Sequence, residues 1–281
     1  MTKTPSGEPL EPVFDWYQST TQAGMEQLRE AFGPISESLP LQHDTPKLKG
    51  YGWALKAGGP GGSLLIHYGG TNGDQFGPNV CATSSLAPAI ADLLRSNQIP
   101  HAVSRADVRL DFLGDFEACR LKMIERLNAA GMQASDNGAC PESLKQTGRT
   151  VYGGSKASLY RPTLYQKGLQ LGDGHPADYL RLEHRFMPSK AVEKRQLANL
   201  TPTEIVGLRP VARDLTQTIA GLAVRAYKLD RAPKARTPYE WMLSQYRKAL
   251  MEQLEDLGSP EAVGKQIFWD LAQLEEASHA G

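Results

Sequence analysis

Residues 148–186, GRTVYGGSKASLYRPTLYQKGLQLGDGHPADYLRLEHRF, contain two β-rich runs separated by glycine and proline. Such turn residues between β-rich runs predict strands joined by loops. Side chains on a strand alternate between its faces, so each run presents one polar face: Arg161, Thr163, Tyr165 and Lys167 on the first, and Arg181, Glu183 and Arg185 on the second. The opposite faces are apolar, with Leu164, Leu180, Leu182 and Phe186. We therefore expect a sheet that is packed on one face and wet on the other.

An earlier run, HAVSRADVRLDF at 101–112, repeats this alternation with four charged residues on one face, Arg105, Asp107, Arg109 and Asp111. Two carboxylates about 7 Å apart on a strand repel each other unless a cation or several donors lie between them. A divalent metal would satisfy both, and Glu183 could supply a third carboxylate from a neighbouring strand. An all-oxygen ligand set favours magnesium, manganese or calcium.

Histidine does not offer an alternative metal site. The six histidines form no His-x-His or His-x-x-x-His pair, which argues against a zinc or bis-histidine centre. The competing interpretation of the acidic residues is a surface strand whose Asp and Arg side chains pair across the ladder, each pair contributing less than about 1 kcal/mol.

Taken in order, these motifs resemble the Rep-trans or replication initiation factor family, the rolling-circle replication initiators of filamentous phages and small plasmids. SRADVRLDF is similar to the family's Arg-x-Asp strand, and GRTVYGGSKAS to its Tyr-x-Gly-Ser hairpin. TLYQKGLQLG resembles the nucleophile strand, and YLRLEHRF the closing Arg-x-Glu strand. FDWYQST, near the start, looks like the family's first strand. The likeness spans roughly residues 12 to 215 and departs from the pattern at Gln166 and at Pro162, where a proline in a strand predicts an edge or a bulge.

The resemblance implies a DNA nicking and joining endonuclease. Tyr165 would attack a phosphodiester at the origin and remain attached to the 5′ phosphate, while the freed 3′ hydroxyl primes synthesis. A phenol with a pKa of about 10 needs a cation or a base to become a nucleophile, and Lys167 is expected on the same face. Arg181 or Arg185 would offset charge on the phosphate.

The same resemblance implies a cofactor and partners. Mg²⁺ or Mn²⁺, held by Asp107, Asp111 and Glu183, would polarise the scissile phosphate. The expected partners are single-stranded or hairpin origin DNA, the replicative helicase and polymerase of the bacterial host, and a second copy of the chain in a homodimer. The expected location is the host cytoplasm, with no membrane partner.

Several alternatives stay open at this point. Tyr152 and Tyr160 lie in the same hairpin and are the other candidate nucleophiles. The same chemistry would serve a relaxase of a conjugative element. A metal-dependent nuclease without a covalent step would not need Tyr165, and a non-enzymatic DNA-binding regulator would rely on stacking aromatic side chains.

Charge is unevenly distributed along a chain whose formal net charge is zero. Residues 140–236 contain 17 Lys and Arg against 8 Asp and Glu, whereas 237–281 contain 3 against 8. A basic segment around the proposed nucleophile is consistent with binding to a polyanion.

The three cysteines suggest a reducing compartment and no disulfide framework. No apolar run reaches the length of a membrane span.

The coarse element order predicts an α+β fold, with an antiparallel-rich sheet built from split βαβ units, as in HUH endonucleases and RRM domains, and helices on one face. No internal repeat is evident in the sequence. We divide the chain into a flexible leader at 1–11, a nicking domain at 12–229 and a C-terminal helical region at 238–281. Beyond residue 187 the pattern predicts helices, including a long one over 201–229.

Overall fold

The computed structural model describes residues 4–59, 61–137, 148–230 and 238–279, and we confine structural statements to them. The chain divides into two compact units, Met1–Asp230 and Arg231–Gly281. The first holds the sheet and the helices packed on it, and the second is helical. Within the described residues, no helix combines the length and the apolar character needed to cross a membrane.

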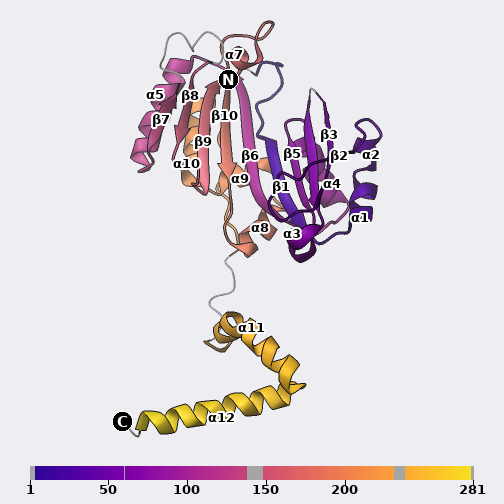
Figure 1. Ribbon diagram of the computed structural model, residues 1–281. Coiled ribbons are helices and arrows are strands. Elements are labelled where there is room, and N and C mark those ends of the chain that lie inside the picture. Colours follow the sequence, from indigo (N-terminus) through magenta and orange to yellow (C-terminus); the bar gives the residue numbers. More distant parts are fainter. Residues whose placement is uncertain (1–3, 60, 138–147, 231–237, 280–281) are drawn as a thin grey trace. The chain divides into compact units, whose positions relative to one another are not determined.

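The first unit is built on one sheet, which has ten strands among the described residues and in which every neighbouring pair is antiparallel (Figure 1). Its strand order is β2-β3-β4-β5-β1-β6-β10-β9-β8-β7. The strands are β1 (Val13–Thr21), β2 (Gln42–Asp44), β3 (Trp53–Gly59), β4 (Gly62–Tyr68), β5 (Asn79–Thr83), β6 (His101–Leu113), β7 (Ala134–Asn137), β8 (Thr150–Gly153), β9 (Tyr160–Gln166) and β10 (Tyr179–Phe186).

The helices of this unit fall between and after the strands. They are α1 (Met25–Ala31), α2 (Gly33–Ser36), α3 (Gly70–Phe76), α4 (Leu86–Ser96), α5 (Phe116–Ala129), α7 (Lys167–Leu171), α8 (Ala191–Leu197), α9 (Pro202–Gly207), α10 (Pro210–Leu215) and the π-helical turn η1 (Thr216–Ala220). The α+β class, the antiparallel sheet and the helical C-terminal region that the sequence predicts are confirmed.

The two halves of the sheet repeat the same topology, which the sequence does not reveal. In chain order, the first half runs β1, α1, α2, β2, β3, β4, α3, β5, α4, and the second runs β6, α5, β7, β8, β9, α7, β10, α8, so that the short helix α2 is the one extra element of the first half among the described residues. Outward from the centre, the strand orders β1-β5-β4-β3-β2 and β6-β10-β9-β8-β7 also correspond. Because the two first strands pair at the centre, the halves join into one continuous sheet.

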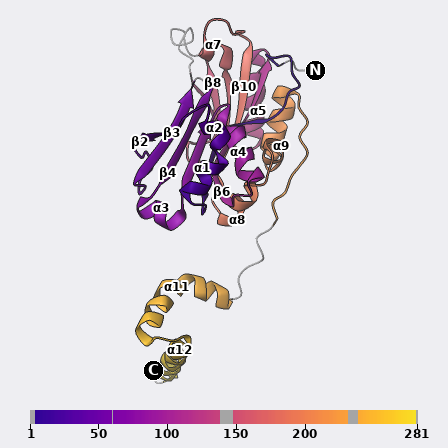
Figure 2. The same cartoon turned by 90° about the vertical axis from the view of Figure 1, so that its right-hand side faces the viewer.

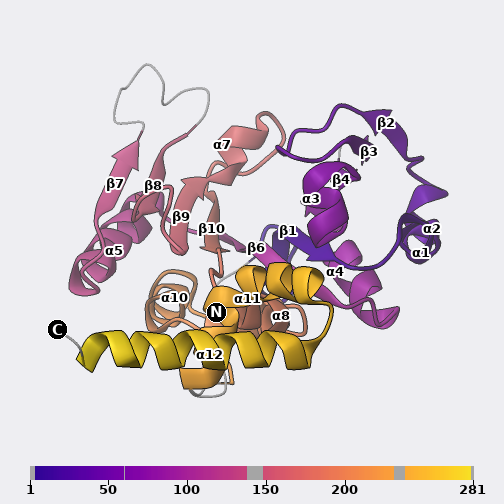
Figure 3. The same cartoon turned by 60° about the horizontal axis from the view of Figure 1, so that its bottom comes forward.

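One face of the sheet forms the core. Apolar side chains that alternate along the central strands are buried against the helices, among them Phe14, Tyr17, Val108, Leu110, Phe112, Leu164, Leu180 and Leu182. Figure 2 shows α4 and α9 beside the strands, and Figure 3 shows α5 and α10 beneath β8 and β9. The alternate side chains of the same strands face away from this core, and the charged ones lie among them.

Two expectations about local structure are wrong. The helix predicted over 201–229 is interrupted at Pro210 and ends at Ala220, because Gly221 adopts a left-handed conformation with φ 72° and the chain beyond it is neither helix nor strand. Strand β9 is not an edge, since it lies between β10 and β8. Its pairing with β8 extends only to Thr163, and the neighbouring Pro162 pairs with β10 alone. The proline thus lies where the β8 side of the strand has no ladder partner, which is the local edge that a proline in a strand predicts.

The second unit contains α11 (Pro238–Leu257) and α12 (Pro260–His279), which contact each other. Three residues at the junction of α11 and α12 account for the break between these helices. Gly258 has φ 73° and ends the first helix, and the Ser259 hydroxyl accepts a hydrogen bond from the Ala262 amide. Pro260 then occupies the first turn, where its missing amide costs nothing.

Candidate active site

Three neighbouring strands bring the predicted residues to one face of the sheet. The antiparallel registers place Arg181 of β10 opposite Asp111 of β6 and opposite Tyr165 of β9. The next residue on this face of β10 is Glu183, which lies opposite Arg109 and Thr163. After it comes Arg185, opposite Asp107 and Arg161. The sheet therefore carries three rows of charged and polar side chains, and Tyr165 ends the first of them.

Tyr165 is hydrogen bonded to a carboxylate. Its hydroxyl donates to Glu183 Oε1 over 2.6 Å. Burial raises the pKa of the Tyr165 phenol well above its ordinary value, and the negative charge of Glu183 adds to that rise. Burial also raises the pKa of Glu183, although the hydrogen bond from Tyr165 opposes the change. The hydrogen bond places Glu183 in position to accept the phenol's proton.

Arg181 is the most enclosed cation of this face, with 5% of its surface exposed. Its guanidinium makes a two-pronged contact with Asp111, with Nε 2.5 Å from Oδ1 and Nη2 2.9 Å from Oδ2. Its remaining nitrogen, Nη1, lies 3.2 Å from Asp15 Oδ1. Burial alone would lower the pKa of Arg181, but its bond to Asp111 and the charge there raise it, so the side chain stays charged.

Asp15 is a site residue that our sequence analysis missed. It comes from β1, on the far side of β6 from β10, and its Oδ1 accepts from Arg109 over 2.8 Å as well as from Arg181. Asp15 lies within FDWYQST, the segment that resembles the family's first strand. That resemblance was the feature of the sequence that could have identified Asp15. A bulge between Phe14 and Trp16 allows the residue to reach this face.

Lys167 does not lie on the strand as expected. Strand β9 ends at Gln166, and Lys167 is the first residue of the short helix α7. Glycine at 168 lets the first turn of α7 pass close to the carbonyl oxygen of Pro176, where any side chain would collide. The Lys167 ammonium group still reaches the nucleophile candidate, 5.8 Å from the centre of the Tyr165 ring, and it donates to Gln170 Oε1 over 2.9 Å. Burial and then the charge of Arg181 lower its pKa.

The three predicted metal ligands are present on the face but are not gathered around a common point. Asp107 and Asp111 lie four residues apart, about 13 Å along the strand, which is roughly twice the spacing expected. Asp107 is paired with Arg105 and Arg185, Asp111 with Arg181 and Arg109, and Glu183 is bonded to Tyr165. Across the described residues, no group of three or more His, Cys, Asp and Glu side chains is placed to hold a metal ion. This arrangement does not fit a divalent cation, and metal dependence stays a prediction.

The structure also separates the candidate tyrosines. Tyr160 faces the core, where its hydroxyl is 2.8 Å from His184 Nδ1, so it cannot reach a substrate on the charged face. Tyr152 lies on the charged face, but the Arg161 guanidinium covers its ring at 4.1 Å from the centroid. Arg105 covers the Trp16 ring in the same way, at 4.0 Å.

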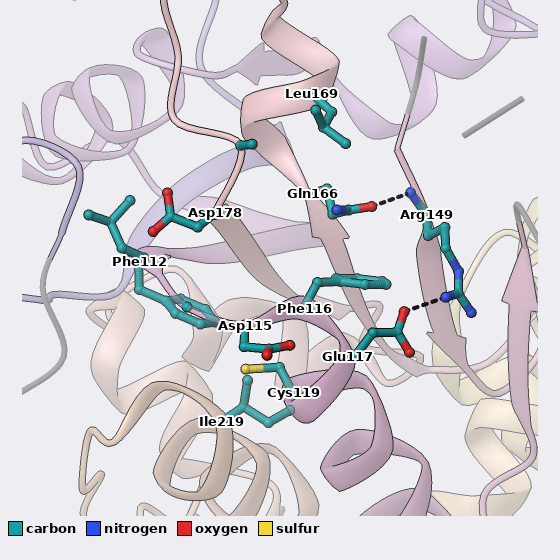
Figure 4. A pocket seen from close by; sticks show the side chains of 13 residues that line it. Phe112, Asp115, Phe116, Glu117, Cys119, Arg149, Gln166, Leu169, Asp178 and Ile219 are labelled. Carbon is teal, nitrogen blue, oxygen red and sulfur yellow. Dashed lines mark hydrogen bonds and ion pairs between the residues drawn. The ribbon is translucent and has the colours of Figure 1, made fainter. Parts of the chain in front are cut away.

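A large pocket lies next to this face, beyond the end of β9 (Figure 4). Its volume is about 1250 Å³, and its lining includes Phe116, Ile219, Glu117, Arg149 and Gln166. Gln166, which departs from the family pattern, accepts a hydrogen bond from the Arg149 amide over 2.9 Å and so ties the end of β9 to the start of β8. Because Tyr165 does not line this pocket, we place the chemistry on the charged face instead.

Comparisons with known proteins agree with the fold. No protein-family model matches the sequence, and no curated protein matches it. Among solved structures, the chain is similar to a rolling circle replication initiator protein from Geobacillus stearothermophilus, with a TM-score of 0.54 and 19% sequence identity. The match covers 79% of this chain and all of that one. At this identity, the likeness establishes the fold.

Proposed function

We propose that this protein initiates rolling-circle replication by nicking and rejoining one strand of origin DNA. The proposal rests on the fold, which is that of a rolling-circle replication initiator, and on the hydrogen bond between Tyr165 and Glu183. The observation that supports this most is the 2.6 Å hydrogen bond from the Tyr165 hydroxyl to Glu183. It pairs a potential nucleophile with a base on an open, charged sheet face. Nucleophile and base within hydrogen-bond reach are the signature of covalent catalysis.

In the proposed reaction, the Tyr165 oxygen attacks the phosphorus of a backbone phosphodiester. The phenol's proton passes to Glu183, and the bond between phosphorus and the 3′ oxygen breaks. That oxygen takes up a proton from water and leaves as a 3′ hydroxyl, and Glu183 then returns its proton to water. The 5′ phosphate stays on Tyr165. Because the phosphotyrosine bond keeps the energy of the phosphodiester, the reverse attack by a 3′ hydroxyl can reseal the strand.

Two cations are available to the phosphate. The Lys167 ammonium lies over the Tyr165 ring and its recorded bond is to a neutral amide, so a phosphate oxygen can replace that partner without leaving a carboxylate unpaired. Arg181 holds its charge in place through Asp111 and Asp15 and lowers the energy of nearby negative charge without having to move. Lys167 thus suits direct contact, and Arg181 suits fixed electrostatic support.

The test uses single-stranded fragments of the protein's own replicon, with and without Mg²⁺ or Mn²⁺. The natural protein is expected to form an adduct that survives denaturation and maps to Tyr165. The Tyr165→Phe protein is expected to form none, while Tyr152→Phe, on the same face, serves as the matched control. An adduct formed by Tyr165→Phe would disprove the assignment of the nucleophile.

Glu183→Gln separates chemistry from binding. It keeps a hydrogen-bond acceptor for the phenol but has no basic site, so adduct formation is expected to slow by about 10²–10⁴-fold with little change in DNA affinity. Comparison of reactions in a chelator with those in added Mg²⁺ or Mn²⁺ tests the predicted metal requirement.

The same experiments distinguish the other candidates. Cleavage with protein-free ends would indicate a plain nuclease, and binding without cleavage would indicate a regulator. An adduct formed on a transfer origin, with none on a replication origin, would indicate a relaxase.

A further inference from the structure

A second pocket lies away from Tyr165, at the other end of the central strands. Its volume is about 710 Å³, and it lies where β1 ends and β6 begins, with Thr20 and Ala102 in its lining. The end of α3 and the last turn of α8 complete it. Both helices lie at this lower end of the central strands in Figure 1.

The lining combines aromatic rings with cations. Tyr51 and Phe76 contribute the rings, and Phe76 is 49% exposed, which leaves much of a large apolar side chain open to a ligand. Lys194 and Arg195 contribute the cations. No Asp or Glu lines the pocket, and among the described residues neither cation has a carboxylate within ion-pair distance.

The Phe76 backbone and the Tyr51 side chain are both anchored. Gln22 Nε2 donates to the Phe76 carbonyl over 3.0 Å, and the Tyr51 hydroxyl lies 3.4 Å from the Gly77 carbonyl. The Tyr51 ring also rests 5.8 Å from the His67 ring. Fixed aromatic rings beside unpaired cations are what single-stranded nucleic acid binds, because bases stack on the rings and phosphates pair with the cations.

The pocket and the charged face share strand β6. Ser104 lines it, and the next residue, Arg105, belongs to the network of arginines and carboxylates on the same strand. From Ala102 to Asp111, beside Arg181 and Tyr165, β6 extends about 30 Å. That length agrees with the span of several nucleotides that single-strand grooves usually cover.

We propose that the pocket of Tyr51, Phe76, Lys194 and Arg195 binds the single-stranded DNA that flanks the nick, about 30 Å from Tyr165 along β6. A base stacks on Phe76, and the adjoining phosphates pair with Lys194 and Arg195. The proposal rests on the proposed function, because it takes its occupant from the DNA that the charged face would cut. It adds a holding site that keeps one flank on the protein during the reaction.

The test measures binding of the full-length protein to a fluorescent 24-nucleotide oligothymidine at several salt concentrations. The double variant Lys194→Gln/Arg195→Gln is expected to bind about tenfold more weakly, and its salt slope is expected to fall by about 1.4, or 0.7 for each phosphate contact removed. The matched control is Arg29→Gln/Lys122→Gln, which removes one arginine and one lysine from exposed helix positions outside the pocket. Equal weakening in the control, or none in the pocket variant, would overturn the proposal.

A second pair of variants addresses stacking. Phe76→Ala is expected to weaken binding about tenfold, and Phe76→Trp is expected to restore it. An oligonucleotide carrying 5-iododeoxyuridine should crosslink to Tyr51 or Phe76 under ultraviolet light, and crosslinks confined to the face around Tyr165 would contradict the proposal.

The adduct assay distinguishes failure of the holding site from failure of the proposed nicking function. An adduct at Tyr165 with unaltered binding by the pocket variants refutes the holding site alone, whereas absence of both adduct and oligothymidine binding refutes both.

Discussion

Arginine and carboxylate side chains on the charged face form two ion-pair networks. In one, Asp107 pairs with Arg105 and Arg185. In the other, Asp15 and Asp111 share Arg109 and Arg181, and Glu183 beside it bonds to Tyr165. Such pairs are sensitive to the loss of one member, because an enclosed charge then has no counter-charge. Their role here is to hold Arg181 at one fixed position beside the phenol.

Asp15 tests the second of these networks. Asp15→Asn keeps an acceptor oxygen but removes the charge that faces Arg109 and Arg181, and it is expected to lower the free energy of unfolding by about 1–3 kcal/mol. Adduct formation should slow as well. Asp92→Asn, whose partner Arg95 lies 3.6 Å away at the surface, is the matched control and should change stability by less than about 1 kcal/mol. Denaturant unfolding measures both, and an Asp15→Asn protein as stable as the natural one would contradict the role given to Asp15.

His184 predicts a pH dependence of stability. It is fully buried between Tyr160 and Thr216, and burial lowers its pKa to about 3. Below pH 6.5 the unfolded chain binds a proton at this position and the folded chain does not, so stability falls as the pH falls. Between pH 7 and pH 5 this group should account for a loss of about 2 kcal/mol.

The variant His184→Gln removes the titration. Its stability should be lower at pH 7, and its loss between pH 7 and pH 5 should be smaller by about 2 kcal/mol. His175→Gln, at an exposed position, is the control and should keep the full dependence. A His184→Gln protein with the same pH profile as the natural chain would show that His184 is not responsible.

At the scale of elements, the connection from β9 through α7 to β10 determines where Tyr165 and Lys167 meet. The strand ends and the helix begins between these two residues, with Gly168 packed on the Pro176 carbonyl. Its counterpart in the other half is the connection from β4 through α3 to β5, which contributes Phe76 to the second pocket. The repeated topology thus places one proposed DNA contact in each half.

Gly168→Ala tests this connection. The added methyl group meets a backbone oxygen that cannot rotate away, so we expect a loss of about 1–3 kcal/mol together with slower adduct formation. The control is Gly24→Ala, where φ is −66° and an added Cβ meets no atom within 4 Å. Thermal unfolding and the adduct assay provide the measurements, and normal activity in Gly168→Ala would separate this connection from the chemistry.

At the scale of the molecule, the sheet and its helices form a unit with its own core, which ends at Asp230. A chain of residues 1–230 is therefore expected to fold alone, with a melting temperature within about 3 °C of the same transition in the full protein. It should also form the Tyr165 adduct. Calorimetry and the adduct assay test this, and an aggregated or inactive fragment would show that the C-terminal helices are required.

The sequence by itself determined the composition of the charged face. Alternation along 101–112, 160–166 and 179–186 separates polar from apolar side chains, and this period-two pattern is local, so it can be read without knowing which strands pair. It also predicted the antiparallel α+β class and the helical C-terminal region.

Only the tertiary structure decided which side chains meet. Asp15 reaches Arg181 across 166 positions of sequence, and the two halves share a topology without a visible repeat. The registers of the sheet pair each proposed metal ligand with an arginine or with Tyr165. Lys167 begins helix α7, and the close contact at Gly168 that this connection requires involves Pro176. These outcomes depend on pairing and packing between distant segments, because hydrogen-bond register and steric contact are properties of two segments together, and neither sequence contains them alone.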